Sequence, residues 1–175
     1  MKINNKKIIF AVGNITDNKN QKQIIEAMHE YRLENAYLIL FGNECDGGEV
    51  RRKITEYKLE DRVILAGFCN SLREYWQYAD INALCSLNEG FGLSVIEAFS
   101  HGVPTVTFSD LDAVPDLFSE DSMLLAKSRS TESLAKAIGE ALRKDWKREE
   151  IKKEALNFTM ETTALKYIEV YKNLI

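Results

Sequence analysis

Residues 86–104, SLNEGFGLSVIEAFSHGVP, hold two carboxylates and a glycine-rich turn. Glu89 comes directly before Gly-Phe-Gly, and Glu97 follows in a mostly apolar segment, with seven residues between the two acids. If a helix begins after Gly92, the amides of Leu93 and Ser94 have no partner inside the helix and can bind an anion. The stretch therefore predicts a phosphate site flanked by two acids.

The spacing of the two glutamates is weak evidence by itself, because chance alone gives about four acidic pairs with this spacing in a chain of this composition. The alternative is that Glu89 is a solvated loop acid and that Glu97 faces water. Against it, Glu97 stands one turn after Leu93, on the same helix face as the first-turn amides. Carboxylates accept hydrogen bonds from vicinal hydroxyls, so a phosphate between two acids matches the layout of a nucleotide sugar.

Apolar runs in the sequence predict the strands and helices that position this stretch. Residues 7–12 form an apolar run that ends at Gly13, which is typical of a strand buried on both faces of a parallel sheet. Further strands are expected at 36–41, 63–66, 80–84, 103–108 and 123–126. Helices are expected at 21–32, 49–57 and 72–78, after Gly92, and at 114–118, 134–142, 149–156 and 161–174.

This alternation predicts an α/β fold, a doubly wound, parallel six-stranded sheet with helices on both faces and helices at the C-terminal end. No linker or repeat divides the chain, so residues 1–175 are expected to form a single domain. Ser130 or Thr131 is the expected N-cap of the helix at 134–142. Trp76 with Tyr75 and Tyr78 is expected in the core.

Composition excludes several classes of function. Lys and Arg number 23 against 27 Asp and Glu, a net charge of −4, which argues against general nucleic-acid or membrane-surface binding. Cys45, Cys69 and Cys85 form no C-x-x-C pair, so we expect reduced thiols in a cytosolic protein and no zinc site. No signal peptide precedes the first strand, and no apolar run approaches the ~18 residues of a membrane span.

Residues 89–104 resemble the Glu-x7-Glu signature of the retaining GT-B glycosyltransferases, in particular the "glycosyl transferases group 1" family. The resemblance extends over residues 10–13, 26–27, 38–42, 61–68, 78–80 and 158–171. It implies the donor-binding, C-terminal Rossmann-like half of such an enzyme, with the N-terminal acceptor domain absent from this chain. We therefore expect the chain alone to bind donor but to transfer little or no sugar.

The resemblance also implies roles for individual residues. Glu97 would hold the ribose hydroxyls of the nucleotide, and Glu89 would contact hydroxyls of the transferred sugar. Lys19, in the loop after the first strand, would neutralise the leaving diphosphate. Glu89 and Lys19 are thus the expected catalytic residues, and His101, at the far end of the helix, is expected to be a plain loop residue.

Several of the remaining donor-binding residues are expected to act through their backbone. The amides of Gly92, Leu93 and Ser94 would lie against the diphosphate, while Gly67 and Phe68 would meet the nucleobase. Asn14, Gly90 and Phe91 complete the expected donor site. Neither a metal nor a cofactor is expected, since the ligand is a donor such as a UDP- or GDP-sugar.

The sequence departs from the family pattern in two places. Asn14 stands where the family usually has an arginine, so we expect weaker diphosphate binding, a slower leaving group or compensation from another residue. Residues 112–116, DAVPD, replace the family's Gly-Gly-x-Pro-Glu. Asp112 could face the donor sugar, but we favour it as the N-cap of the short helix near Val114.

The resulting prediction is a donor domain that transfers a hexose-type sugar to a glycan or lipid-linked acceptor. The alternative is a non-catalytic or degenerate nucleotide-sugar-binding module, which Asn14 and Asp112 favour. An unrelated Rossmann-like regulator, an epimerase and a phosphorylase are the weaker alternatives. The resemblance implies polysaccharide or glycolipid assembly in the cytoplasm, with peripheral association at the inner face of the membrane as one option.

Overall fold

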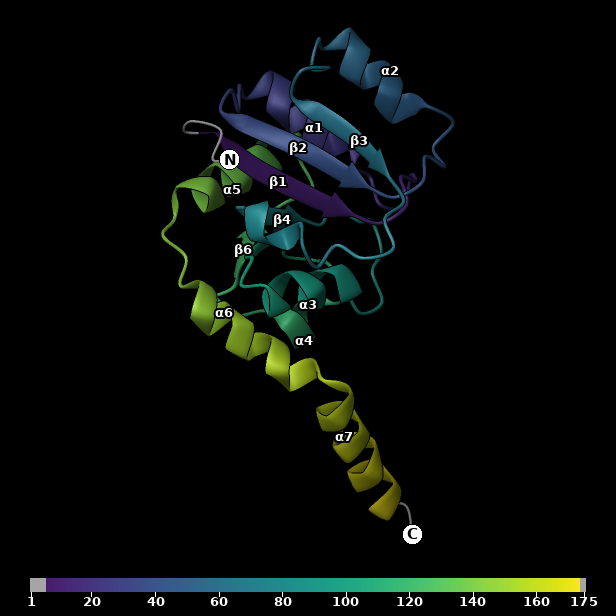
Figure 1. Ribbon diagram of the computed structural model, residues 1–175, viewed down its shortest axis with the longest axis vertical. Coiled ribbons are helices and arrows are strands. Elements are labelled where there is room, and N and C mark those ends of the chain that lie inside the picture. The colour runs from purple at the N-terminus through teal and green to yellow at the C-terminus, as the bar shows by residue number, and fades with distance from the viewer. Residues whose placement is uncertain (1–5, 174–175) are drawn as a thin grey trace.

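A six-stranded, all-parallel sheet forms the centre of the molecule in the computed structural model, which describes residues 6–173 (Figure 1). The strands follow the order β3-β2-β1-β4-β5-β6 across the sheet. Their bounds are β1 Lys7–Val12, β2 Ala36–Phe41, β3 Val63–Gly67, β4 Ile81–Ala83, β5 Thr105–Phe108 and β6 Met123–Ala126. The predicted α/β fold with a doubly wound parallel sheet is confirmed.

Helices connect the strands and cover the sheet. Their bounds are α1 Lys22–Glu30, α2 Glu49–Glu56, α3 Leu93–Ser100, α4 Val114–Leu117, α5 Thr131–Arg143, α6 Arg148–Ala155 and α7 Met160–Lys172. Helix α1 packs beside α2 and α5, while α3 packs beside α6. The predicted helix 161–174 corresponds to α7, and its last predicted residue, Leu174, lies outside the described residues.

Strand β1 shows why the sheet needs cover on both faces. Ile9 and Ala11 are buried in the larger core, together with residues of α1 and α5. Phe10 points to the opposite face, where its ring lies 4.9 Å from that of Phe41 and 5.3 Å from that of Trp76. Successive side chains of a strand alternate between faces, so a continuous apolar run requires apolar partners on both sides.

The helix predicted at residues 72–78 is wrong, because the structure has only a 3-10 turn at Trp76–Tyr78. A segment this short forms a helix only with support from packing. Here Trp76 is fully buried, whereas Tyr75 and Tyr78 are 48% and 55% exposed. The expected aromatic core cluster therefore holds for Trp76 alone.

The two predicted helix caps have opposite outcomes. Ser130 is the N-cap of α5, and its hydroxyl oxygen accepts a hydrogen bond from the Ser133 amide at 3.1 Å. Asp112 as the cap of α4 is wrong, since Ala113 occupies that position and Asp112 is exposed. The backbone of Ala113 is already helical, so the chain enters α4 from a preceding turn rather than through an extended capping residue.

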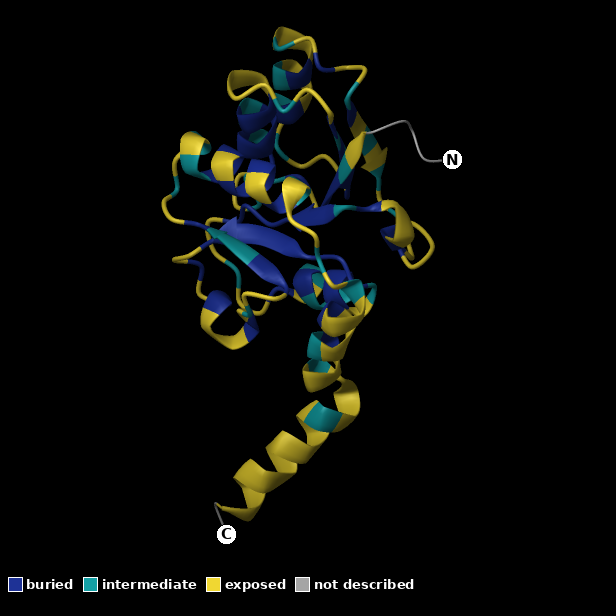
Figure 2. Cartoon of the chain, turned by 90° about the vertical axis from the view of Figure 1, so that its left-hand side faces the viewer, coloured by how far each residue is buried: buried dark blue, intermediate teal, exposed yellow. Residues whose placement is uncertain are grey.

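Helix α7 extends away from the body of the protein, and Figure 2 colours it exposed along nearly its whole length. Its exposed large apolar side chains are Met160, Leu165, Tyr167, Ile168, Val170 and Tyr171. Across the described residues, none of the helices is both long and apolar enough to span a membrane.

Candidate functional site

The order of the strands brings two distant loops together at one edge of the sheet. Strand β1 has β2 on one side and β4 on the other, so the chain changes direction across the sheet between them. In open parallel sheets, ligands bind outside the carboxyl ends of the strands at such a switch point. The loops at this point are residues 13–21, after β1, and residues 84–92, after β4.

Asn18 ties these two loops to each other. Its carbonyl accepts a hydrogen bond from the Leu87 amide at 2.7 Å. Its side-chain amide donates to the Asn88 carbonyl at 3.0 Å, and its side-chain oxygen accepts from the Asn88 amide at 3.2 Å. Three hydrogen bonds therefore set the position of the first loop relative to the second.

A cleft of about 490 Å³ lies between the loops and the start of α3. Eight of the predicted site residues line it: Lys19, Glu89, Gly90, Phe91, Gly92, Leu93, Ser94 and Glu97. Val12 and Gly13 form the remainder of the wall. The structure thus places both expected catalytic side chains and most of the expected donor-binding backbone around one space.

Lys19 and Glu89 form an ion pair in this cleft, with 2.5 Å between Nζ of Lys19 and Oε2 of Glu89. The same carboxylate oxygen accepts a hydrogen bond from the Ser86 hydroxyl at 3.1 Å. The Lys19 and Glu89 side chains are 26% and 15% exposed, respectively, so the pair is partly shielded from water. A cation and an anion therefore stand together within the cleft, each within reach of a ligand there.

The start of α3 supplies the amides that the sequence predicts. Gly92 is the N-cap and has a left-handed backbone, with φ of 79°. The first hydrogen bond of the helix runs from the Val95 amide to the Gly92 carbonyl at 2.8 Å. Within residues 6–173, the amides of Gly92, Leu93 and Ser94 donate to no acceptor. They are therefore free to bind an anion in the cleft.

Glu97 lies one turn further along α3 and is half-buried at the cleft wall. Its carboxylate makes no hydrogen bond or ion pair with any described residue. At the other end of the helix, His101 is the C-cap, with Nδ1 2.9 Å from the Glu97 carbonyl. His101 is thus turned to the helix end, as the sequence indicates.

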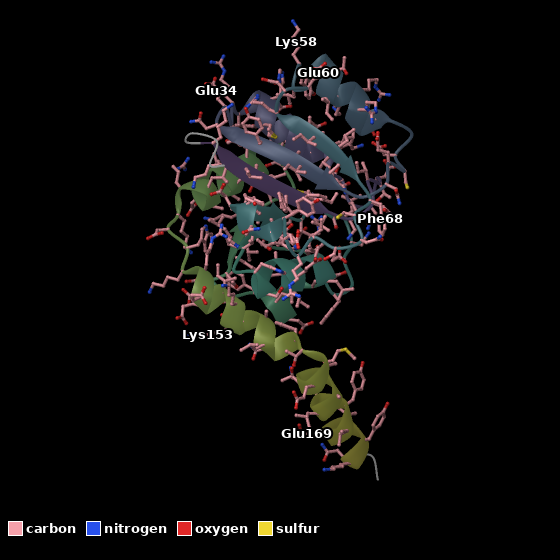
Figure 3. All side chains as sticks on the ribbon, in the orientation of Figure 1. Glu34, Lys58, Glu60, Phe68, Lys153 and Glu169 are labelled. Atoms are coloured by element: carbon pink, nitrogen blue, oxygen red, sulfur yellow. The ribbon has the colours of Figure 1, made fainter. Side chains whose placement is uncertain are left out.

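Three predicted residues lie outside the cleft walls. Asn14 is exposed, and its side-chain oxygen accepts a hydrogen bond from the Asn43 amide at 3.1 Å. Gly67 ends β3, and Phe68, labelled in Figure 3 near the carboxyl ends of β1–β3, is 67% exposed. Their roles in donor binding stay predictions. Among the described residues, no cluster of metal-ligating side chains is present.

Ser86 and Asn18 also shape the site, and neither is predicted from the sequence. Ser86 is fully buried three residues after the end of β4, and a polar side chain that follows an apolar run is a signal that could have found it. Asn18 is one of several polar residues in its loop, and nothing in the sequence distinguishes it from the others.

The sequence of this chain matches that of a known protein family over most of its length. The family model described as "Glycosyl transferases group 1" matches residues 2–158. The chain belongs to this family. Its sheet and helices correspond to the GT-B fold of the glycosyltransferases.

Individual relatives agree with the family assignment. The O-antigen biosynthesis glycosyltransferase WclY of Escherichia coli is 29% identical over 170 residues, which are 94% of this chain and 46% of WclY. Sucrose-phosphate synthase from Thermosynechococcus elongatus superimposes with a TM-score of 0.83 at 27% identity, over 97% of this chain and 45% of that one.

Anabaena HepE, in complex with UDP and glucose, shares the fold with a TM-score of 0.79 at 21% identity, over 97% of this chain and 48% of HepE. This group 1 chain therefore spans about half the length of these relatives.

Proposed function

We propose that this chain is the donor-binding half of a retaining glycosyltransferase that uses a nucleotide-diphosphate sugar. The observation that carries the proposal is the cleft in which the Lys19–Glu89 pair and the Glu97 carboxylate surround the three unpaired amides of α3. An anion held at these amides would have a carboxylate on each side, as a diphosphate between a ribose and a sugar requires.

The charged side chains and free amides of the cleft each have a proposed role toward one part of the donor. Glu97 would accept hydrogen bonds from the ribose hydroxyls, and Glu89 from hydroxyls of the transferred sugar. Lys19 and the amides of Gly92 to Ser94 would stabilise the charge that develops on the departing diphosphate. Rate enhancement would come from positioning the donor and from preorganised charge. Gly67 and Phe68 would contact the nucleobase.

The acceptor would bind mainly to another domain. The relatives are about twice as long as this chain, and the apolar side chains of α7 are exposed, which supports a further domain in the working enzyme. We propose that the chain alone binds donor but transfers a hexose to a glycan or lipid-linked acceptor weakly or not at all. The enzyme would work in the cytoplasm. Because the net charge of −4 argues against membrane-surface binding by this chain, any association with the inner face of a membrane would be made by another domain.

The donor would be a UDP- or GDP-sugar, and no resident cofactor or metal is proposed. The structure of HepE in complex with UDP and glucose supports a UDP-sugar as the donor. A second candidate function is a non-catalytic nucleotide-sugar-binding module. Asn14 favours it, because an asparagine brings no charge to a diphosphate where the family usually has an arginine.

Thermal unfolding with UDP, GDP, ADP and their glucose conjugates tests the proposal. A ligand at 100 times its Kd should raise the unfolding free energy by about 2.7 kcal/mol, which raises the Tm. Glu97→Ala should lose most of that response, and Glu56→Ala, which changes an exposed glutamate of α2, should keep it.

The outcomes separate the parts of the proposal. No rise in Tm with any nucleotide at millimolar concentration would remove the donor-domain proposal. An equal rise in wild type and Glu97→Ala would remove only the ribose assignment. Donor binding by a full-length enzyme that transfers no sugar would favour the non-catalytic module.

A further inference from the structure

We infer that Arg129 is a positioning residue for Glu89, whose carboxylate would contact the donor sugar. Arg129 orients this carboxylate through Ser86. The inference rests on the proposed function of the cleft. Arg129 lies in the loop between β6 and α5, at the same edge of the sheet as the cleft. It does not line the cleft, so any effect it has on a ligand must pass through another residue.

The Arg129 guanidinium joins the loops that follow three neighbouring strands. Its Nη1 donates to the Ser86 carbonyl, after β4, at 2.6 Å. Its Nε donates to the Asp110 carboxylate, after β5, at 2.8 Å and 3.0 Å. The guanidinium also lies 4.9 Å from the centre of the Phe108 ring. A planar group with donors in a fixed fork can hold such an arrangement, which a flexible ammonium cannot.

Arg129 is itself held in place. Its carbonyl accepts a hydrogen bond at 2.6 Å from the side-chain amide of Gln23, a buried residue of α1. Its side chain is 31% exposed, so water screens its contacts only in part. The hydrogen bond from its charged guanidinium to a buried carbonyl is therefore among the stronger contacts near the cleft.

The contact with Ser86 connects Arg129 to the side chains of the cleft. Ser86 is fully buried, and its hydroxyl donates to the Glu89 oxygen that also pairs with Lys19. If Arg129 releases the Ser86 carbonyl, the backbone of Ser86 can shift and its hydroxyl no longer fixes the carboxylate. The series Arg129, Ser86, Glu89, Lys19 thus links a residue outside the cleft to the pair inside it.

The first test needs no ligand. In wild type, the Lys19 ammonium should give a 1H–15N NMR signal protected from exchange by its pairing with Glu89, identified by its absence in Lys19→Met. Arg129→Met and Ser86→Ala should each broaden or remove this signal, whereas Arg73→Met, at an exposed arginine, should leave it unchanged. An unchanged signal in folded Arg129→Met would overturn the inference, even if no nucleotide binds.

The second test measures Kd by calorimetry for UDP and UDP-glucose, and for the GDP and ADP pairs. Arg129→Met should weaken the nucleotide sugar about tenfold, or about 1.4 kcal/mol, and leave the nucleotide diphosphate within about twofold. Arg129→Lys should recover part of the loss, because an ammonium can still reach one acceptor. Equal weakening of both ligands would indicate a merely structural role and overturn the inference, as would no weakening of either.

Discussion

Lys19 and Glu89 stand 70 positions apart in the chain, yet their charged atoms lie 2.5 Å apart. The pair joins the loop after β1 to the loop after β4, at the point where the strand order reverses. The same charged atoms therefore hold the two loops together and take part in the proposed chemistry. An incoming diphosphate would compete with Glu89 for the Lys19 ammonium.

We predict that Lys19→Met and Glu89→Gln each lower the unfolding free energy by about 1–2 kcal/mol, between the values of exposed and buried pairs. The double variant should lose less than the sum, with a coupling of about 1 kcal/mol. Urea unfolding of the four proteins measures this. The Glu132–Lys136 pair of α5, which is well exposed, is the control and should show a smaller coupling. Additive losses at Lys19 and Glu89 would show that the pair contributes nothing to stability.

Gly42 supports the loop that carries Lys19. A Cβ at position 42 would lie 2.2 Å from the Gly13 carbonyl oxygen and 2.8 Å from the Asn14 nitrogen, and its φ is 146°. We predict that Gly42→Ala lowers the unfolding free energy by at least about 3 kcal/mol, because backbone must move to admit the methyl group.

Gly47→Ala is the matched control for Gly42→Ala. Gly47 also has a positive φ, of 67°, but no atom lies within 4 Å of its Cβ position. It should lose only about 1 kcal/mol, from backbone strain alone. Chemical unfolding compares the two variants, and equal losses would contradict the importance of the close approach between the loops after β1 and β2.

The buried thiol of Cys85 is expected to make the unfolding free energy depend on pH. Burial raises the pKa of its thiol to about 12, although the nearby charge of Arg129 lowers it in part. The folded protein keeps this proton, while the unfolded chain loses it above pH 9.0, the ordinary pKa of the thiol. The contribution of Cys85 to the unfolding free energy is complete below that pH and falls as pH rises, by about 1.4 kcal/mol at pH 10.

Variants at the cysteines isolate this contribution. Between pH 7.5 and pH 10, the unfolding free energy of Cys85→Ala should fall less than that of wild type. Cys45→Ala, at an exposed cysteine, should fall as wild type does. Parallel curves for wild type and Cys85→Ala would show that the thiol does not resist ionisation in the fold.

Most of the fold can be predicted from the sequence. The bounds of β1, β2 and β6 agree with the predicted strands, because a strand buried on both faces must be apolar at consecutive positions. Gly92 likewise marked the start of α3, and Ser130 the start of α5. These signals are local, so each can be read from neighbouring residues without knowledge of the remainder of the chain.

How these elements meet depends on contacts between distant parts of the chain. The order of the strands sets Lys19 against Glu89, and Asn18, Ser86 and Arg129 gain their partners from loops that are distant in sequence. The predictions for residues 72–78 and for Asp112 are wrong for the same reason. Their conformations depend on what the chain packs against, as the fully buried Trp76 shows, and not on the local pattern of residues.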